Sequence, residues 1–114
     1  RLCRRVCQKC AETYTVTRAH LADFPEATEP EYTLTRGKGC EHCDGTGFYG
    51  RMGLYELIVV DEEMRALIQQ TAEAGPIRNL AREKGTRFLR ESGWQAILSG
   101  ASTVEEIRRV TQWA

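Results

Sequence analysis

Two Cys-x-x-Cys pairs are the residues of this sequence whose types and spacing best support chemistry. Cys7 and Cys10 form the first pair, Cys40 and Cys43 form the second, and 29 residues separate the two pairs. A tight turn directs both sulfurs of one pair at the same ion, and two pairs supply the four thiolates that tetrahedral Zn²⁺ prefers. Because four thiolates leave no open coordination position, the spacing predicts a structural zinc site and not a catalytic one.

The fifth cysteine and a nearby histidine are not needed in this site. The count of five cysteines is odd and leaves Cys3 over. A secreted disulfide framework favours an even count and denser spacing, so we favour reduced thiols in a cytosolic setting over two disulfides. Cys3 is expected to be a small buried hydrophobic residue. His42 lies inside the second pair and is an alternative ligand, although the four cysteines already complete the set.

The segment enclosed by the cysteines is too short to fold without help. Residues 7–43 number 37, and chains below about 40 residues rarely bury enough apolar surface to fold alone. Structural zinc supplies an apparent stabilisation of about 10–16 kcal/mol at neutral pH. We therefore predict a small subdomain in which the metal replaces a core. Basic residues near the cysteines either offset the charge of the site or are ordinary surface residues: Arg4, Arg5, Lys9, Arg36 and Lys38.

Strands are expected to carry the cysteines. Residues 13–17 and 31–35 have strand composition and are expected to pair, with a loop between them. Six glycines between residues 37 and 53 suit turns that need positive φ or a close backbone approach. Residues 54–60 are apolar and rich in β-branched side chains, which predicts a strand that is at least partly buried.

The pattern changes to helices at Asp61, which is suited to cap a helix. Gly75 is expected to end this helix, and Pro76 suits the first turn of a second helix that ends at Gly85. A third helix is predicted over about residues 86–99 and a fourth after a capping box at 102–105.

The four helices are expected to form a compact bundle. Trp94 and Trp113 are expected to pack inside it. Gly93 should weaken the third helix by about 1 kcal/mol relative to alanine.

Composition limits the function. The chain has 114 residues, and its 16 basic and 16 acidic residues give a formal net charge of zero, which argues against a strongly electrostatic nucleic-acid binder. It contains no run of 18 apolar residues and no Gly-x-x-x-x-Gly-Lys-Ser/Thr loop, so neither a transmembrane segment nor a nucleotide site is predicted in it. The absence of an initial methionine predicts a fragment.

Local motifs leave two binding functions open. Cys40-x-x-Cys43-x-Gly45-x-Gly47 is similar to the repeat unit of the zinc region of J-domain chaperones, which suggests a protein-binding module of the zinc-knuckle type. That unit recurs four times in the chaperones, whereas one full unit is present here. A zinc-ribbon nucleic-acid binder is suggested by cysteine spacing alone.

Longer motifs follow one another along nearly the whole chain. They are Arg1-Leu2-x-Arg4-Arg5-x-Cys7-x-x-Cys10, then Gly39-Cys40-x-x-Cys43-x-Gly45-Thr46-Gly47-Phe48-x-Gly50-Arg51-x-Gly53-Leu54-Tyr55-Glu56-Leu57, and finally Gly100-x-Ser102-Thr103-x-Glu105-Glu106-Ile107-x-Arg109-Val110-Thr111. In this order they resemble the C-terminal part of the secretion ATPases that power type II secretion and type IV pilus assembly, the GspE/PilB group. The stretch from Gly39 to Leu57 is the most specific part.

The resemblance implies an α+β fold with four parts. Residues 1–6 would end an upstream RecA-like domain, 7–43 would form the tetracysteine zinc-binding β-ribbon subdomain, 44–60 would return to the RecA-like domain, and 61–114 would form a C-terminal subdomain like a four-helix bundle. The zinc ligands would be Cys7, Cys10, Cys40 and Cys43.

The resemblance also implies a function for the longer parent protein. The parent would be a cytoplasmic hexameric ATPase, peripheral at the inner membrane, whose ATP and Mg²⁺ bind outside this chain. Its partners would be the neighbouring subunits and the inner-membrane secretion or pilus platform proteins, and no nucleic acid. This chain alone would not be an enzyme.

Overall fold

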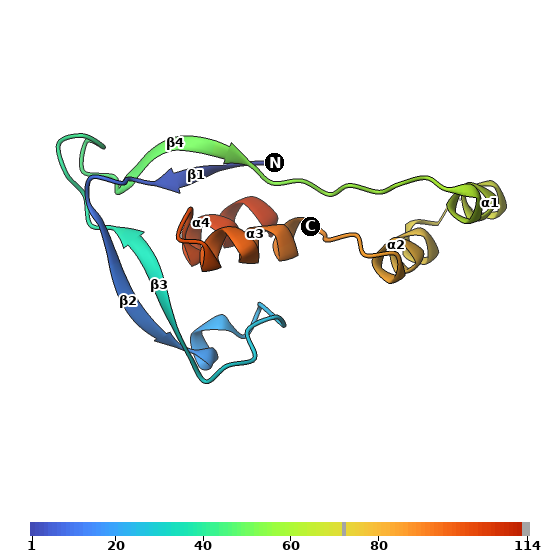
Figure 1. The fold of residues 1–114 in the computed structure, drawn as a ribbon, viewed down its shortest axis with the longest axis horizontal. Helices are drawn as coiled ribbons and strands as arrows, with labels where there is room; N and C mark the ends of the chain where they lie inside the picture. Colours follow the sequence, from blue (N-terminus) through green and yellow to red (C-terminus); the bar gives the residue numbers. More distant parts are fainter. Residues whose placement is uncertain (72, 113–114) are drawn as a thin grey trace.

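The computed structural model describes residues 1–71 and 73–112, and Trp113 lies outside them. The fold is α+β, as predicted, with antiparallel strands in the N-terminal half and helices in the C-terminal half (Figure 1). In chain order the elements are β1 (Leu2–Val6), β2 (Ala11–Thr17), the 3₁₀ helix η1 (Arg18–Leu21), β3 (Glu31–Gly37), β4 (Phe48–Gly53), α1 (Glu62–Gln70), α2 (Ala74–Glu83), α3 (Leu89–Leu98) and α4 (Val104–Thr111).

The strands form two antiparallel ribbons that meet at a corner. β2 pairs with β3, which confirms and extends the predicted pairing of 13–17 with 31–35, and β1 pairs with β4. Because β1 leads into β2 and β3 leads into β4, the two ribbons are arms of one bent hairpin. Figure 1 shows the arms diverging from the corner, and the four predicted metal ligands lie in the two connections there.

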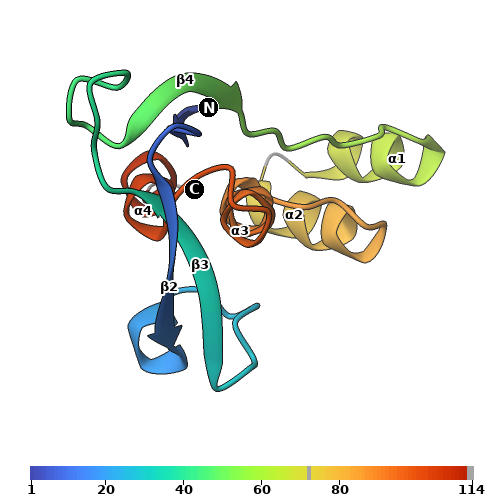
Figure 2. The same cartoon turned by 60° about the vertical axis from the view of Figure 1, so that its left-hand side comes forward.

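The main core lies in the angle between the two arms, where α3 and α4 pack (Figures 1 and 2). Trp94 of α3 is buried, as predicted, with its ring centroid 5.5 Å from that of Phe24 and 5.2 Å from that of Tyr32. Leu21, Phe24 and Leu34 belong to the same buried cluster as Ile97 and Ile107. The segment 7–43 therefore shares a core with the C-terminal helices, which differs from the prediction that a metal replaces its core.

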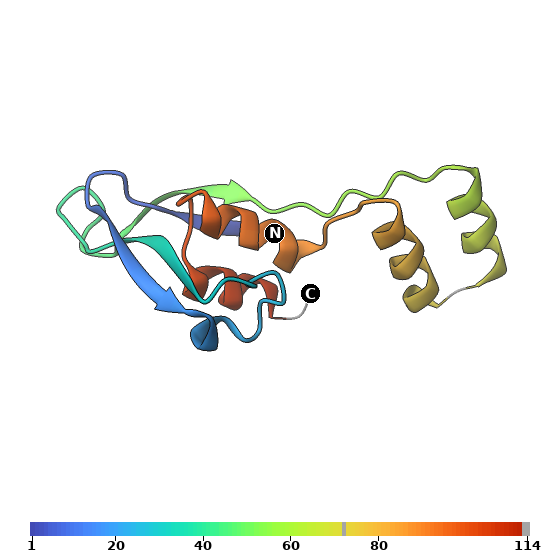
Figure 3. The same ribbon diagram turned by 60° about the horizontal axis from the view of Figure 1, so that its bottom comes forward.

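The four helices form two separate pairs and not one bundle. α1 and α2 pack on each other around Met64, Ala81 and Phe88, and Figure 3 shows this pair set apart from α3 and α4. Extended links separate the pairs, so the molecule is elongated, with principal extents of 54 × 30 × 19 Å. Among the described helices, none is both long enough and apolar enough to cross a membrane.

The predicted strand over 54–60 is wrong. The segment is extended but joins no sheet of the described residues. Tyr55, Leu57 and Val59 are 76%, 76% and 71% exposed. The hydroxyl of Ser92 donates to the carbonyl of Tyr55 at 2.8 Å, and that of Thr86 donates to the carbonyl of Leu57 at 3.0 Å. Side-chain hydroxyls thus occupy carbonyls that a neighbouring strand would use.

Helix boundaries follow the predicted caps in part. Asp61 caps α1 as predicted, because its carboxylate accepts the backbone N–H of Met64 at 2.9 Å. Gly75 does not end α1; it lies in the first turn of α2. The third helix begins at Leu89, three residues later than predicted. Thr103 caps α4 by accepting the N–H of Glu106 at 3.1 Å, one residue after the predicted cap.

The predicted cap, Ser102, instead holds the free edge of β1. Its hydroxyl donates to the carbonyl of Arg4 at 2.8 Å, while the N–H of Arg4 donates to the Glu106 carboxylate at 2.8 Å. The N–H of Val6 donates to the carbonyl of Ala101 at 2.8 Å. The start of α4 therefore takes the place of a third strand beside β1, and β1 is paired on both edges.

Glu106 is the centre of this contact. Its side chain is fully buried and accepts hydrogen bonds from the guanidinium groups of Arg4 and Arg109. Burial opposes its ionisation, but the hydrogen bonds from Arg109 and Arg4 lower the pKa of Glu106 to about 2. A buried carboxylate that is paired in this way ties the first strand to the last helix.

Candidate metal centre

The structure brings the four predicted cysteines together. Their sulfur atoms all lie within 4.8 Å of one another. The Sγ–Sγ distances are 3.8 Å for Cys7 to Cys40, 3.8 Å for Cys10 to Cys43 and 3.7 Å for Cys40 to Cys43. A tetrahedral ion with Zn–S bonds of about 2.3 Å separates its sulfurs by about 3.8 Å. The four sulfurs therefore fit one tetrahedral ion.

The cysteines are not paired as disulfides. All five cysteines are free thiols, and a disulfide bond requires sulfurs about 2.05 Å apart. The preference for reduced, metal-binding thiols over two disulfides is consistent with this geometry.

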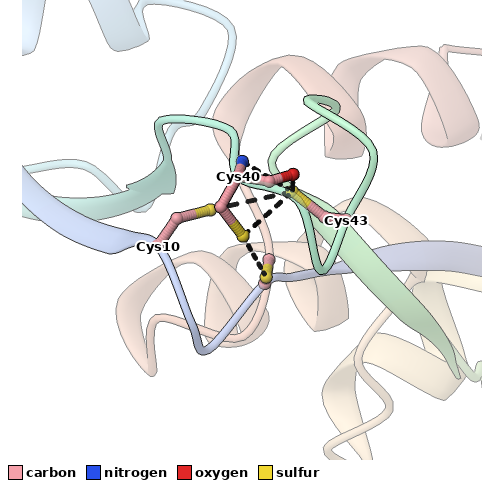
Figure 4. Close-up of side chains that lie close together, drawn as sticks. Cys10, Cys40 and Cys43 are labelled. Carbon is pink, nitrogen blue, oxygen red and sulfur yellow. Dashed lines mark hydrogen bonds between the residues drawn. The ribbon is translucent and has the colours of Figure 1, made fainter.

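The bent hairpin positions the sulfurs. Cys7 follows β1 and Cys10 precedes β2, and the N–H of Cys10 donates to the carbonyl of Cys7 at 3.4 Å in the turn between them. Cys40 and Cys43 lie in the connection from β3 to β4, where the N–H of Gly45 donates to the carbonyl of Cys40 at 2.8 Å. Figure 4 shows the side chains of Cys10, Cys40 and Cys43 converging on one point.

Two glycines let the two ends of the β3–β4 connection, which carries Cys40 and Cys43, approach each other closely. A Cβ atom on Gly37 would lie 2.1 Å from the carbonyl oxygen of Gly47, and one on Gly47 would lie 2.3 Å from the oxygen of Gly37. Gly47 also has a φ of +80°, a conformation that favours glycine. Its carbonyl accepts the N–H of Cys7 at 2.9 Å, and this hydrogen bond ties the β3–β4 connection to the one that carries Cys7 and Cys10.

Backbone N–H groups point at two of the sulfurs. Cys43 Sγ accepts from the N–H of Gly47 at 3.2 Å and from that of Cys40 at 3.3 Å, and Cys10 Sγ accepts from the N–H of Gly39 at 3.3 Å. Such bonds orient metal-bound thiolates. Burial opposes ionisation of Cys43, but these N–H groups lower its pKa to about 6. Burial raises the pKa of Cys10 to about 12, although the hydrogen bond from the Gly39 N–H acts in the opposite direction.

Other residues near the cysteines lie outside the cluster. Cys3 is 1% exposed in the main core, which confirms it as a small buried hydrophobic residue. His42 is exposed, and its ring stacks on Tyr49 at a centroid distance of 4.1 Å. Arg4 and Arg36 have carboxylate partners of their own, Glu106 and Glu12, so neither is reserved for the charge of the sulfurs.

Sequence reasoning missed Glu106 and Ser102, which hold β1 beside the corner. The Ser-Thr-x-Glu-Glu pattern at 102–106 indicated a helix cap, but its second role depends on Arg4, which lies 102 residues from Glu106 in the sequence. A pattern within one helix carries no signal for such a distant partner.

Comparison with known proteins gives the family. The sequence model described as "Type II/IV secretion system protein" matches residues 1–109. A type IV pilus assembly ATPase PilB of Thermus thermophilus is 41% identical over 112 residues, which cover 94% of this chain and 12% of that protein. A type II secretion system protein E of Pseudomonas aeruginosa is 38% identical over 112 residues, which cover 98% of this chain and 22% of that protein.

The chain thus spans between 12% and 22% of the length of these relatives. The match includes both cysteine pairs and α3–α4 up to Arg109, and it confirms the resemblance drawn from the motifs. The family match over residues 1–109 includes far more of the chain than the similarity to the chaperones, which is limited to one zinc-knuckle unit. With 109 of its 114 residues matched, the chain belongs to the type II/IV secretion system protein family.

Proposed function

We propose that this chain is a segment of a cytoplasmic, hexameric ATPase that acts at the inner membrane and powers type II protein secretion or type IV pilus assembly. The family match over residues 1–109 carries the proposal, and the names of the relatives support it. The sequence contains no phosphate-binding loop of the Walker type. In the proposed protein, ATP and Mg²⁺ therefore bind to residues outside this chain.

The proposed role of the segment is mechanical. Cys7, Cys10, Cys40 and Cys43 would hold one structural Zn²⁺, and the Sγ–Sγ distances of 3.7–3.8 Å support this assignment. The ion would supply a rigid junction between the two ribbons and, with four thiolate ligands, no open position for substrate. The corner would then move as a body and present its loops to a neighbouring subunit or to a platform protein of the inner membrane.

The surface of the chain is consistent with the proposed division into domains. We assign 1–6 and 44–60 to a RecA-like domain, 7–43 to the zinc subdomain and 61–114 to the helical subdomain. Support for the return to a RecA-like domain comes from the alternate residues Tyr55, Leu57 and Val59, each more than 70% exposed on an extended segment. Apolar side chains in such a row suit a covering domain.

The test uses the full-length protein that contains this chain. A double variant, Cys7→Ser with Cys10→Ser, is compared with Cys3→Ala, which removes the buried cysteine outside the cluster. We expect the double variant to lose one zinc per subunit and to lose secretion or pilus assembly, while the control retains both. ATPase activity is measured on each. Unchanged zinc content would refute the metal centre, and zinc loss with intact ATPase activity and assembly would refute its mechanical role.

A further inference from the structure

We propose that Cys40 is the reactive thiolate of the cysteine cluster, the site at which hydroperoxides and soft electrophiles first modify this chain. The proposal rests on the metal centre described above and extends it. It concerns which of four chemically equivalent ligands is open to attack, and the geometry around each sulfur separates them.

Cys40 is the most exposed of the four cysteines. Cys7, Cys10 and Cys43 are 0%, 7% and 5% exposed, whereas Cys40 is partly exposed. It lines a shallow surface hollow, and we infer that a small reagent reaches it from there. The hollow is lined by Cys40 together with Lys38, Gly39, Glu41, Asp44 and Gly45.

Hydrogen bonding separates Cys40 from Cys10 and Cys43, while burial separates it from Cys7. Cys43 Sγ accepts two backbone N–H groups and Cys10 Sγ accepts one. Within residues 1–71 and 73–112, no backbone N–H donates to the sulfur of Cys40, and its own N–H is directed to Cys43. A bond from a neutral donor stabilises a thiolate and lowers its nucleophilicity. Cys40 therefore combines access with the electron-rich sulfur that electrophiles attack.

The chemistry follows from this placement. The Cys40 thiolate attacks the terminal oxygen of a hydroperoxide. An S–O bond forms as the O–O bond breaks, so the sulfur is oxidised by two electrons to a sulfenic acid and the hydroperoxide is reduced to an alkoxide or hydroxide that leaves. The thiolate of Cys7 at 3.8 Å or Cys43 at 3.7 Å then attacks the sulfenic sulfur, forming an S–S bond and releasing hydroxide. Two thiolates would remain, too few for a closed tetrahedral site, so the cluster would hold a metal ion less tightly.

The test follows modification of the zinc-loaded protein. Metal content is measured first by native mass spectrometry, and limiting iodoacetamide is then added, which alkylates a thiolate with loss of iodide. Peptide mass spectrometry maps the label over time, and a colorimetric chelator records zinc release. We expect Cys40 to be labelled at least tenfold faster than Cys3, Cys7, Cys10 or Cys43, and zinc release to follow the labelling of Cys40 and not to precede it. Equal labelling, or another cysteine labelled first, overturns the proposal.

A protein without zinc at the start refutes the metal centre instead, so the two failures are distinguishable. A charge variant tests the route through the hollow. Lys38→Glu is compared with Lys9→Glu, which makes the same change of charge outside the lining. We expect Lys38→Glu to slow labelling by anionic iodoacetate several-fold relative to neutral iodoacetamide, and Lys9→Glu to change this ratio less. Equal effects of the two variants would show that the reagent does not enter through the hollow, which also overturns the proposal.

Discussion

Replacing Gly47 by alanine tests whether the close approach of Gly37 and Gly47, at the two ends of the β3–β4 connection, holds the cysteines in place. Gly47 has a φ of +80°, and Gly45, two residues earlier, has a φ of +76°. An alanine at either position pays the same conformational penalty, about 1 kcal/mol. The surroundings differ, because a Cβ on Gly47 would lie 2.3 Å from the carbonyl oxygen of Gly37, whereas one on Gly45 meets no atom within 4 Å.

The clash at Gly47 is with backbone, so side-chain motion does not relieve it. The two ends of the β3–β4 connection must move apart. This movement strains the hydrogen bond from Gly47 N–H to Cys43 Sγ at 3.2 Å and the one from Cys7 N–H to the Gly47 carbonyl at 2.9 Å. Overpacking of this kind costs about 1–3 kcal/mol beyond the conformational term. Since metal binding and ordering of the loop are coupled, we expect the affinity for zinc to fall about ten- to hundred-fold more in Gly47→Ala than in Gly45→Ala.

Competition against a chromophoric zinc chelator at fixed pH measures both affinities, and circular dichroism before titration checks that each variant retains its helices. Equal zinc affinities for the two alanine variants would refute the reasoning, because the conformational penalty is common to both.

Three further predictions concern the cores and the helix ends. Gly93→Ala should lower the free energy of unfolding by about 1–3 kcal/mol, because a Cβ would lie 2.4 Å from Ile107 Cγ2. Gly75→Ala, where a Cβ meets no atom within 4 Å, should raise the free energy of unfolding by about 0.5–1 kcal/mol. Urea unfolding that ranks the two variants the other way would contradict the packing argument. Thr103→Ala should cost about 1 kcal/mol in the same assay through loss of the α4 cap, and an unchanged midpoint would show that the cap is not needed. In the folded protein the pKa of Glu106 is about 2, below its ordinary value of 4.5, so its contribution to stability is complete above pH 4.5 and is lost as pH falls through 2. Near pH 6 we expect the free energy of unfolding of the wild type to exceed that of Glu106→Gln by up to about 3 kcal/mol, reduced by solvent screening at its half-exposed arginine partners. A difference that does not shrink on acidification would contradict this.

The features that were predicted well depend on local information. The spacing within each Cys-x-x-Cys pair and the composition of the flanking strands involve neighbours in the sequence. The structure brings the four cysteines together in the β1–β2 and β3–β4 connections. Asp61 was likewise identified from its own position before an apolar run, and it caps α1.

The features that were missed depend on distant partners. Gly93 was expected to weaken its helix, but it lies where Ile107 of α4 packs against α3, so its lack of a side chain permits that contact. The apolar run at 54–60 has strand composition, yet the described residues provide no strand beside it. Burial of Glu106 depends on Arg4, at the other end of the chain. Periodicity along one segment gives no measure of what covers it.

The angle between the two ribbons is fixed at two places by different interactions. At the corner, the cysteine cluster and the hydrogen bond from Cys7 N–H to the Gly47 carbonyl join the two connections. At the inner edge of β1, Ser102 and Glu106 bind the backbone of Arg4 and fasten the first ribbon to α4, while α3 and α4 pack in the same core as β3.

Either set of contacts alone would leave one arm to rotate about the other. Because both are present, movement of the first strand must carry the corner and α3–α4 with it, whereas α1 and α2 have their own core and are joined through extended links. In the proposed ATPase, this division would carry a displacement of β1 to the exposed loops of the corner, a role that a closed metal site can serve without chemistry of its own.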